Sequence, residues 1–160
     1  MKIYLAGPLF TQSQRAWLRN LKEELEGIET SQNGPLEVIW PYDLISRTEI
    51  ARLAHLARRE IFLRCKAGLD EARILLALLD GPQVDDGTAW EIGYFWAKKR
   101  PEQKIIGIRT DFRQAGESQG ALVNAMIEMS CDLVVKSKEG ALGIWEQINQ
   151  EKAICGTLQR

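Results

Sequence analysis

Three carboxylates stand close together near the middle of the chain: Asp85, Asp86 and Glu91, in the segment VDDGTAWEIG. A carboxylate can attack the anomeric carbon of a sugar while a second carboxyl group handles the proton of the leaving group. The segment therefore indicates glycosyl transfer, with Glu91 as the nucleophile and Asp85 or Asp86 beside it for proton transfer or for binding sugar hydroxyls. The same residues also fit a simpler interpretation, in which the aspartates cap a helix and Glu91 lies on its surface.

Other chemistries are disfavoured by the residues that the chain lacks. It has one histidine, His55, and three widely spaced cysteines, Cys65, Cys131 and Cys155. We therefore expect no metal site, no disulfide framework and no Ser-His or Cys-His catalysis. Because neither a dinucleotide-binding G-x-G-x-x-G nor a P-loop motif occurs, no cofactor is predicted.

The elements that must position the carboxylates have the pattern of an open α/β sheet. The run Ile74–Leu79 has the composition of a strand buried on both faces, and Gly81 and Pro82 end it before a helix that carries Glu91. Ligands bind at such carboxyl ends of strands. The other short β-prone runs are Lys2–Ala6, Leu36–Trp40, Lys104–Ile108 and Asp132–Lys136. We predict a doubly wound, five-stranded parallel sheet of the flavodoxin-like or Rossmann-like kind.

Helical spacing of apolar residues fills the gaps between these runs. The predicted helices cover Gln12–Glu26, capped by Thr11 or Ser13, then Thr48–Asp70 as one helix or two, Ala121–Met129 and Gly140–Gln150. The polar loop Arg109–Arg113 follows the fourth strand and is a second candidate wall of the site. We predict one domain over residues 1–150 and a C-terminal tail over residues 151–160.

Composition sets limits on partners and location. The chain is 45% hydrophobic and 27% charged, with a formal net charge of -1, so we expect no polymeric nucleic-acid partner. No apolar run approaches the roughly 20 residues that cross a bilayer, and strand-like sequence starts at Lys2 without a secretory signal. We therefore predict a cytoplasmic protein that does not enter a membrane.

Four pieces of the sequence together resemble one known family. The segment DDGTAWEIG is similar to the D-x-G-x-x-x-E-x-G signature of the nucleoside 2-deoxyribosyltransferases, and KIYLAGP, WPYD and VNAMIE are similar to that family's other motifs in the same order. The resemblance implies a flavodoxin-like fold and transfer of 2-deoxyribose between bases through a covalent glycosyl-Glu intermediate. It also implies homo-oligomers in which a neighbouring subunit completes each site, and small-molecule deoxynucleosides and free bases as partners.

The resemblance assigns roles by position. Glu91 would be the nucleophile, Tyr4 would contact and orient it, and Asp85 would contact the sugar hydroxyls. Asn124 would come from a neighbouring subunit and reach the 5'-hydroxyl. The remaining predicted substrate-binding positions are Gly7, Asp43, Asp86 and Gly87.

Two positions depart from the family pattern. Cys65 stands where members commonly have an Asp or Asn that helps with the leaving base, and Ile45 replaces a glutamine that some members use against the base. A thiol is a weak donor and acceptor. Asp70, about one turn later, is a candidate substitute for Cys65. These changes bear on base choice and on whether a second base accepts the sugar.

Three alternatives stay open from the sequence. A deoxynucleoside 5'-monophosphate N-glycosidase resembles the chain at the same signature, although Asn124 favours an unphosphorylated nucleoside. Phosphoribohydrolases that activate cytokinin nucleotides share G-T-x-x-E with Gly87–Glu91, but without the preceding Pro-Gly-Gly. The loop Arg109–Arg113 offers cations for a phosphate in either case. The third alternative is a nucleoside or nucleotide sensor that has lost the chemistry.

Overall fold

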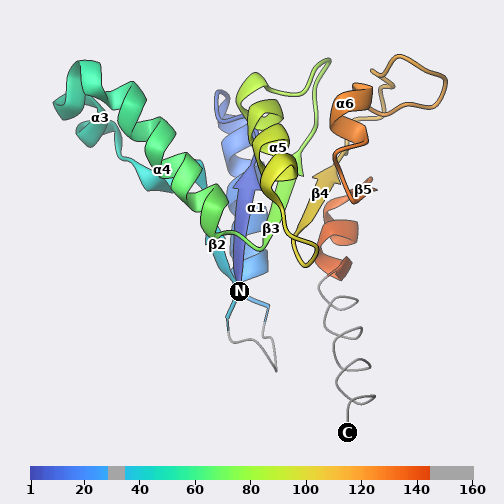
Figure 1. Ribbon diagram of the computed structural model, residues 1–160, viewed down its shortest axis with the longest axis horizontal. Coiled ribbons are helices and arrows are strands. Elements are labelled where there is room, and N and C mark those ends of the chain that lie inside the picture. Colours follow the sequence, from blue (N-terminus) through green and yellow to red (C-terminus); the bar gives the residue numbers. More distant parts are fainter. Residues whose placement is uncertain (29–34, 145–160) are drawn as a thin grey trace, which may run out of the picture.

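The computed structural model describes residues 1–28 and 35–144, and it shows one sheet with helices on both faces (Figure 1). Neighbouring strands all pair in parallel, in the order β2-β1-β3-β4-β5. The strands are β1 (Lys2–Ala6), β2 (Glu37–Ile39), β3 (Ile74–Leu78), β4 (Lys104–Ile108) and β5 (Leu133–Val135). This is the flavodoxin-like strand order, so the predicted fold class is confirmed.

Helices connect the strands near the positions that the sequence predicts. They are α1 (Gln12–Glu26), α2 (Pro41–Leu44), α3 (Arg47–Leu53), α4 (Ala57–Glu71), α5 (Asp86–Lys98) and α6 (Ala125–Glu128). Of the two predicted caps of α1, Thr11 is the one used: its hydroxyl accepts from the backbone N–H of Gln14, whose side chain accepts from the N–H of Thr11. This reciprocal pair satisfies two otherwise free donors at the start of the helix.

The side chains of β1 alternate between two cores. Ile3 and Leu5 point to the face that α1 covers, whereas Tyr4 and Ala6 point to the face that α4 and α5 cover (Figure 1). All five residues of β3 are buried, as expected for a central strand packed on both sides. The period of two in β1 therefore decides that Tyr4 lies on the same side of the sheet as the helix that carries Glu91.

Two predicted helices differ from the structure. The helix predicted over Thr48–Asp70 is divided into α3 and α4 by a 3-10 turn, η1 (Ala54–Leu56), at whose start Ala54 has φ 48°. The helix predicted over Ala121–Met129 shrinks to α6, because Asn124 caps it and the Glu128 carboxylate accepts from the N–H of Leu122. Side-chain acceptors that bind preceding N–H groups compete with earlier helix formation.

The C-terminal predictions fall largely beyond the described residues. Residues 138–144 are helical and place Ala141 and Ile144 in the core beside α1, but the rest of the helix predicted to Gln150 lies outside the described residues. So does the predicted tail at 151–160. In residues 1–28 and 35–144, no helix is long and apolar enough to cross a membrane.

Gly68 of α4 gives a first prediction, because the helix approaches β1 and β2 closely there. A Cβ at Gly68 would lie 2.8 Å from Cγ2 of Ile39 and 3.1 Å from Cε2 of Tyr4. We expect Gly68→Ala to lower the free energy of unfolding by about 1–3 kcal/mol, measured by urea denaturation. The matched control is Gly93→Ala in α5, where a Cβ would meet nothing within 4 Å. That change should raise stability by about 0.5–1 kcal/mol. Equal effects of the two substitutions would contradict the packing argument.

Candidate active site

Tyr4 and Glu91 form the centre of the candidate site. The Tyr4 hydroxyl donates a hydrogen bond to Oε1 of Glu91 over 2.5 Å, joining residues 87 positions apart in the sequence. Tyr4 is fully buried in β1, and Glu91 is partly buried in α5. Because β1 and β3 are neighbours in the sheet, the helix that follows β3 passes over the tyrosine of β1.

Burial controls the charge of Glu91. It raises the pKa of this carboxyl group to about 7, and the negative charge of Asp85 adds to the rise, while the hydrogen bond from Tyr4 opposes it. The helix begins at Asp86, so Glu91 lies in the second turn, beyond the reach of strong stabilisation by the helix amino end. Close to neutral pH, the carboxyl group therefore exists in both its ionised and its protonated form.

The two aspartates differ in their surroundings. Asp85 caps α5, since its Oδ2 accepts from the backbone N–H of Thr88 over 3.0 Å and from the Thr88 hydroxyl over 3.1 Å. Asp86 is exposed, and its Oδ1 accepts from the N–H of Gly87 over 2.7 Å. A Cβ at Gly87 would lie 3.2 Å from Oδ2 of Asp85. The capping interpretation thus holds for Asp85, whose charge still acts on Glu91.

A pocket of about 540 Å³ opens beside this centre, between the loop after β1, α2, α3 and α4. Asp43 lines it from α2 and lies 3.7 Å from the Lys22 ammonium. Ile45, the residue after α2, also lines it. Arg64 fixes the segment that carries these residues, because it donates to the carbonyl of Leu44 over 2.7 Å and pairs with Glu49 over 2.6 Å. The spacing of four residues in the sequence predicts the ion pair of Arg64 with Glu60, but it does not predict the contacts of Arg64 with Leu44 and Glu49.

Cys65 stands between this pocket and the Tyr4–Glu91 pair. It lines the pocket and packs against the core cluster that contains Tyr4, and burial raises the pKa of its thiol. Asp70 does not take its place, which corrects the suggested substitution. The Asp70 carboxylate instead accepts from the Tyr94 hydroxyl over 2.6 Å and from Lys66 over 2.7 Å, at the far end of α4. The side chain beside Tyr4 is therefore a neutral thiol.

Asn124 and Gly7 lie away from the Tyr4–Glu91 contact. Asn124 caps α6, donates to Glu117 and lines a second pocket, of about 410 Å³, together with Asp86. It faces the side of α5 that packs near α6, whereas Glu91 faces β1. Gly7 serves packing, since a Cβ there would lie 3.0 Å from Cδ1 of Leu18. Within one chain, the structure joins Tyr4, Glu91 and Asp85, but it does not bring Asn124 to them.

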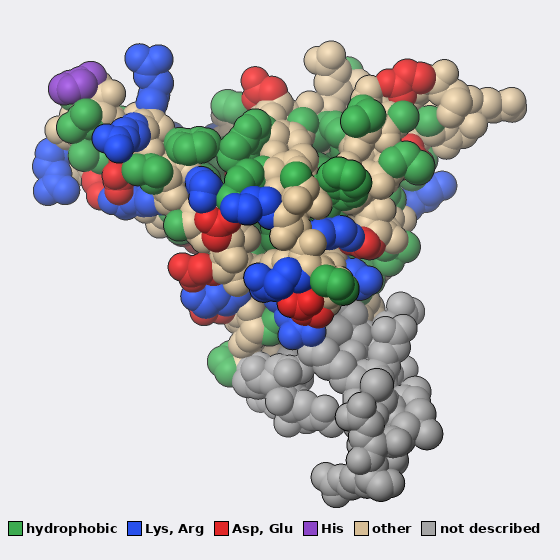
Figure 2. All heavy atoms as spheres, viewed as in Figure 1, with side chains coloured by type: hydrophobic (Ala, Val, Ile, Leu, Met, Phe, Trp, Pro, Cys, Tyr) green, Lys and Arg blue, Asp and Glu red, His purple; other side chains and the backbone are tan. Residues whose placement is uncertain are grey.

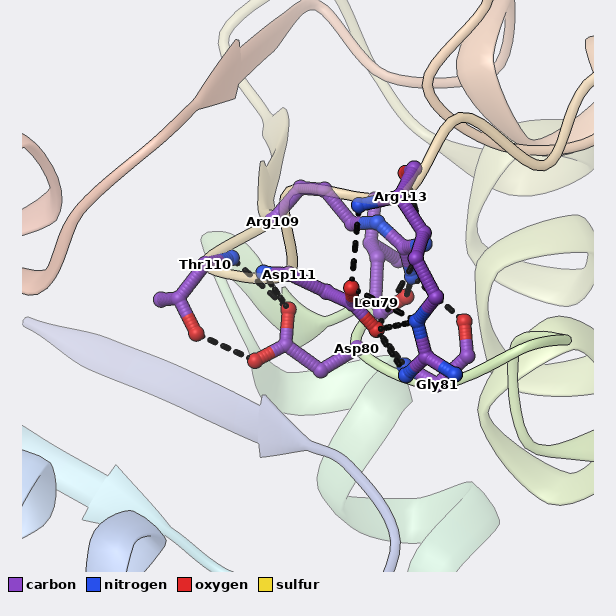
Figure 3. Close-up of polar contacts among 7 residues, drawn as sticks. All are labelled: Leu79, Asp80, Gly81, Arg109, Thr110, Asp111 and Arg113. Carbon is purple, nitrogen blue, oxygen red and sulfur yellow. Dashed lines mark hydrogen bonds and ion pairs between the residues drawn. The ribbon is translucent and has the colours of Figure 1, made fainter.

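The loop after β4, residues 109–113, is held to the turn after β3 by the buried side chain of Arg109 (Figure 3). We call this arrangement the clamp. Arg109 is 2% exposed, and its guanidinium donates to the carbonyls of Leu79, Gly81 and Arg113. The Asp80 carboxylate accepts from the N–H groups of Thr110 and Asp111 over 2.7 and 3.0 Å. The Arg113 guanidinium pairs with Asp111 and lowers the pKa of that carboxyl group. Arg109 thus has partners in the turn after β3 and in its own loop, and Arg113 is paired with Asp111 in that loop.

The clamp yields a second prediction. Arg109→Met removes the donor to three carbonyls and should lower the free energy of unfolding by about 3 kcal/mol or more, because the carbonyls lose their partner inside the protein. The control is Arg113→Met, because the Arg113 side chain is 52% exposed and its loss should lower stability much less. Thermal unfolding followed by circular dichroism measures both. A midpoint for Arg109→Met within a degree of the wild-type value would contradict the clamp.

Comparison with known proteins gives one consistent result. A family model described as nucleoside 2-deoxyribosyltransferase matches residues 3–126. An uncharacterized protein of Ureaplasma parvum is 34% identical over 124 residues, covering 71% of this chain and 72% of its own. A conserved protein from Enterococcus faecalis has a similar structure, with a TM-score of 0.71, 26% identity and coverage of 92% of this chain and 98% of that one.

Two solved enzymes share the fold at lower identity. The 2-deoxyribosyltransferase of Bacillus psychrosaccharolyticus has a TM-score of 0.64 at 20% identity, covering 88% of this chain and 90% of its own. The corresponding protein of Leishmania mexicana also has a TM-score of 0.64, at 22% identity, covering 90% of this chain and 95% of its own. At these identities the similarity supports the fold.

Proposed function

Since the chain belongs to the nucleoside 2-deoxyribosyltransferase family, we propose that it cleaves the N-glycosidic bond of 2'-deoxynucleosides through a covalent intermediate on Glu91 and passes the deoxyribose to another base. The observation that carries the proposal is the contact between the Tyr4 hydroxyl and Oε1 of Glu91 beside a pocket of ligand size. A partly buried carboxyl group next to a pocket is a good candidate for covalent glycosyl chemistry.

The proposed reaction has two displacements at the same carbon. An oxygen of ionised Glu91 bonds to C1' as the C1'–N bond breaks, and the electron pair leaves with the base nitrogen, which takes a proton from water. A nitrogen of the acceptor base then bonds to C1', the C1'–O bond to Glu91 breaks, and the acceptor loses its proton to water. Tyr4 holds the carboxylate by its hydrogen bond, and we propose that Asp85, whose charge acts on Glu91, also contacts the sugar hydroxyls.

The charges near the site favour an unphosphorylated substrate. The two arginines considered for phosphate binding are engaged, Arg109 by three carbonyls and Arg113 by Asp111. Asp86 lines the pocket of about 410 Å³ together with Arg109, and its negative charge opposes a phosphate there. We therefore rank nucleosides above their 5'-monophosphates.

We also propose that a second copy of the chain completes the site. Apolar side chains gather over α4, α5 and α6 (Figure 2), and Trp96, Met126 and Met129 are 55%, 78% and 74% exposed around Asn124. A partner that covers this face would bring its own Asn124 toward a neighbouring site. Sedimentation velocity at micromolar concentration should show a dimer or larger species, and Trp96→Glu should dissociate it. A wild-type monomer would contradict the shared site.

The cellular location is a further part of the proposal. Cys65 and Cys131 are free thiols, which suits a reducing compartment, and we propose a cytoplasmic enzyme of nucleoside salvage. The division into a domain at 1–150 and a tail at 151–160 remains a prediction from sequence.

Chromatography of reaction mixtures tests the proposed activity. Purified protein is incubated with deoxyadenosine, deoxyinosine, deoxycytidine or thymidine, each with and without a second free base. We expect a new deoxynucleoside that appears only when the acceptor is present. Free base alone would indicate a hydrolase, and repeating the assay with 5'-monophosphates would test the phosphorylated substrates. No product from any substrate would contradict an enzyme and favour a binding protein.

A further inference from the structure

We infer that the 540 Å³ pocket holds the base of its substrate by shape and apolar contact, and that it discriminates weakly among bases by hydrogen bonding. The inference rests on the proposed function, because it takes this pocket as the base site. Half of the ten lining residues are aliphatic or proline side chains: Leu9, Pro41, Ile45, Ile50 and Ile61. These side chains can exclude water from a base, but they cannot identify the donors and acceptors on its edge.

Two polar residues of the lining already have partners. The Ser46 hydroxyl accepts from the backbone N–H of Glu49 over 3.1 Å, where it caps α3. Asp43 lies 3.7 Å from the Lys22 ammonium and is about half exposed. A base that bonded to Asp43 would have to compete with this ammonium and with water.

The other polar side chains of the lining also offer few specific hydrogen bonds to the edge of a base. The Tyr42 ring packs on Trp40 with 5.0 Å between centroids, and its hydroxyl, which can donate or accept, does not by itself distinguish one base edge from another. Arg47 is exposed, so that water competes for its guanidinium. Cys65 is the lining residue that contacts Tyr4, and its thiol is a weak donor and acceptor. The inner end of the pocket, closest to Glu91, therefore offers a base little directional bonding.

The size of the expected discrimination follows from this lining. A pocket that hydrogen-bonds a substrate group rejects an analogue without that group by about 10⁴–10⁵-fold, because its own polar atoms are left unpaired. An apolar pocket separates ligands by only about 10–200-fold, since each methylene contributes little. The lining of this pocket is that of an apolar pocket, so we expect the weaker discrimination.

Calorimetric binding to the full-length Glu91→Gln variant tests the inference without turnover. The ligands are deoxyadenosine, deoxyinosine and purine 2'-deoxyriboside, which differ only at the edge of the purine ring. We expect the three Kd values to lie within about tenfold of one another. A loss of 1,000-fold or more for purine 2'-deoxyriboside would overturn the inference, and so would the absence of binding by all three.

Variants of the pocket sharpen the test. Ile45→Ala should weaken all three ligands by a similar factor, and Ile45→Gln should spread their Kd values because it adds an amide that only some bases can pair. The control is Leu63→Ala, an exposed position on α4 outside the lining, which should change no Kd. Weak selectivity in binding together with no turnover by the wild-type protein would uphold the inference and reject the proposed function. Strong selectivity in binding together with turnover would reject the inference and uphold the proposed function.

Discussion

Glu91→Gln should abolish glycosidic cleavage, lowering kcat by about 10⁴-fold or more, because an amide cannot form the ester to C1'. The same change should stabilise the fold at high pH. The pKa of Glu91 is about 7 in the folded protein, against a reference value of 4.5. Folding therefore favours the protonated form, and the stability of the wild-type protein falls as pH rises from about 4.5 to 7.

The variant lacks this ionisation, so its advantage in unfolding free energy should be near zero at pH 4 and reach about 3 kcal/mol at pH 8. Urea denaturation at both pH values measures it, and deoxynucleoside cleavage measures the loss of activity. Glu23→Gln, an exposed change on α1, should leave both properties unchanged. Cleavage at the wild-type rate would remove Glu91 from the nucleophile role. A stability gain that is equal at the two pH values would show that burial does not hold the proton.

Tyr4→Phe has the second largest expected effect, and it should act through Glu91. The Tyr4 hydroxyl favours the ionised carboxylate, so its removal should raise the pKa of Glu91 above about 7. Since the ionised form is the nucleophile, kcat of the wild type should rise with pH through about 7. In the variant this rise should move to higher pH, and kcat at pH 7 should fall by about 10–100-fold.

The measurement is kcat at intervals from pH 5.5 to 9.5. Part of the lost rate should return near pH 9, which a purely structural defect would not produce. Tyr94→Phe serves as the control, because its hydroxyl donates to Asp70 at the outer end of α4. That variant should keep the wild-type pH dependence. If kcat of Tyr4→Phe rises at the same pH as kcat of the wild type, Tyr4 does not change the pKa of Glu91.

Much of the arrangement follows from strand periodicity and chain order. The alternation of β1 and the position of Glu91 after β3 are both visible in the sequence, and a parallel sheet brings them together at one edge. The strand limits of β1 and β4 agree with the predictions, since both are short apolar runs with clear ends. Local patterns that depend on neighbouring residues are therefore readable before the fold is known.

Features that depend on contacts between residues far apart in the chain could not be predicted from the sequence. The sequence shows that Glu91 lies near the start of a helix, but it does not show the burial that raises the pKa of this carboxyl group to about 7. Arg109 resembled a phosphate ligand in a polar loop, but carbonyls from the β3 turn enclose it. Asp70 was one turn from Cys65, and its contact with Tyr94 of another helix turns it away from the pocket. In each case a partner far along the chain decides the role.

Intact-mass spectrometry of the protein during turnover tests the covalent mechanism most directly. Protein mixed with deoxyadenosine and quenched in acid should carry one added 2-deoxyribosyl group, and the peptide that contains Glu91 should hold it after digestion. The species should disappear when an acceptor base is added before the quench, and it should be absent from Glu91→Gln. Turnover with no adduct at any quench time, or an adduct on a different peptide, would contradict Glu91 as the nucleophile.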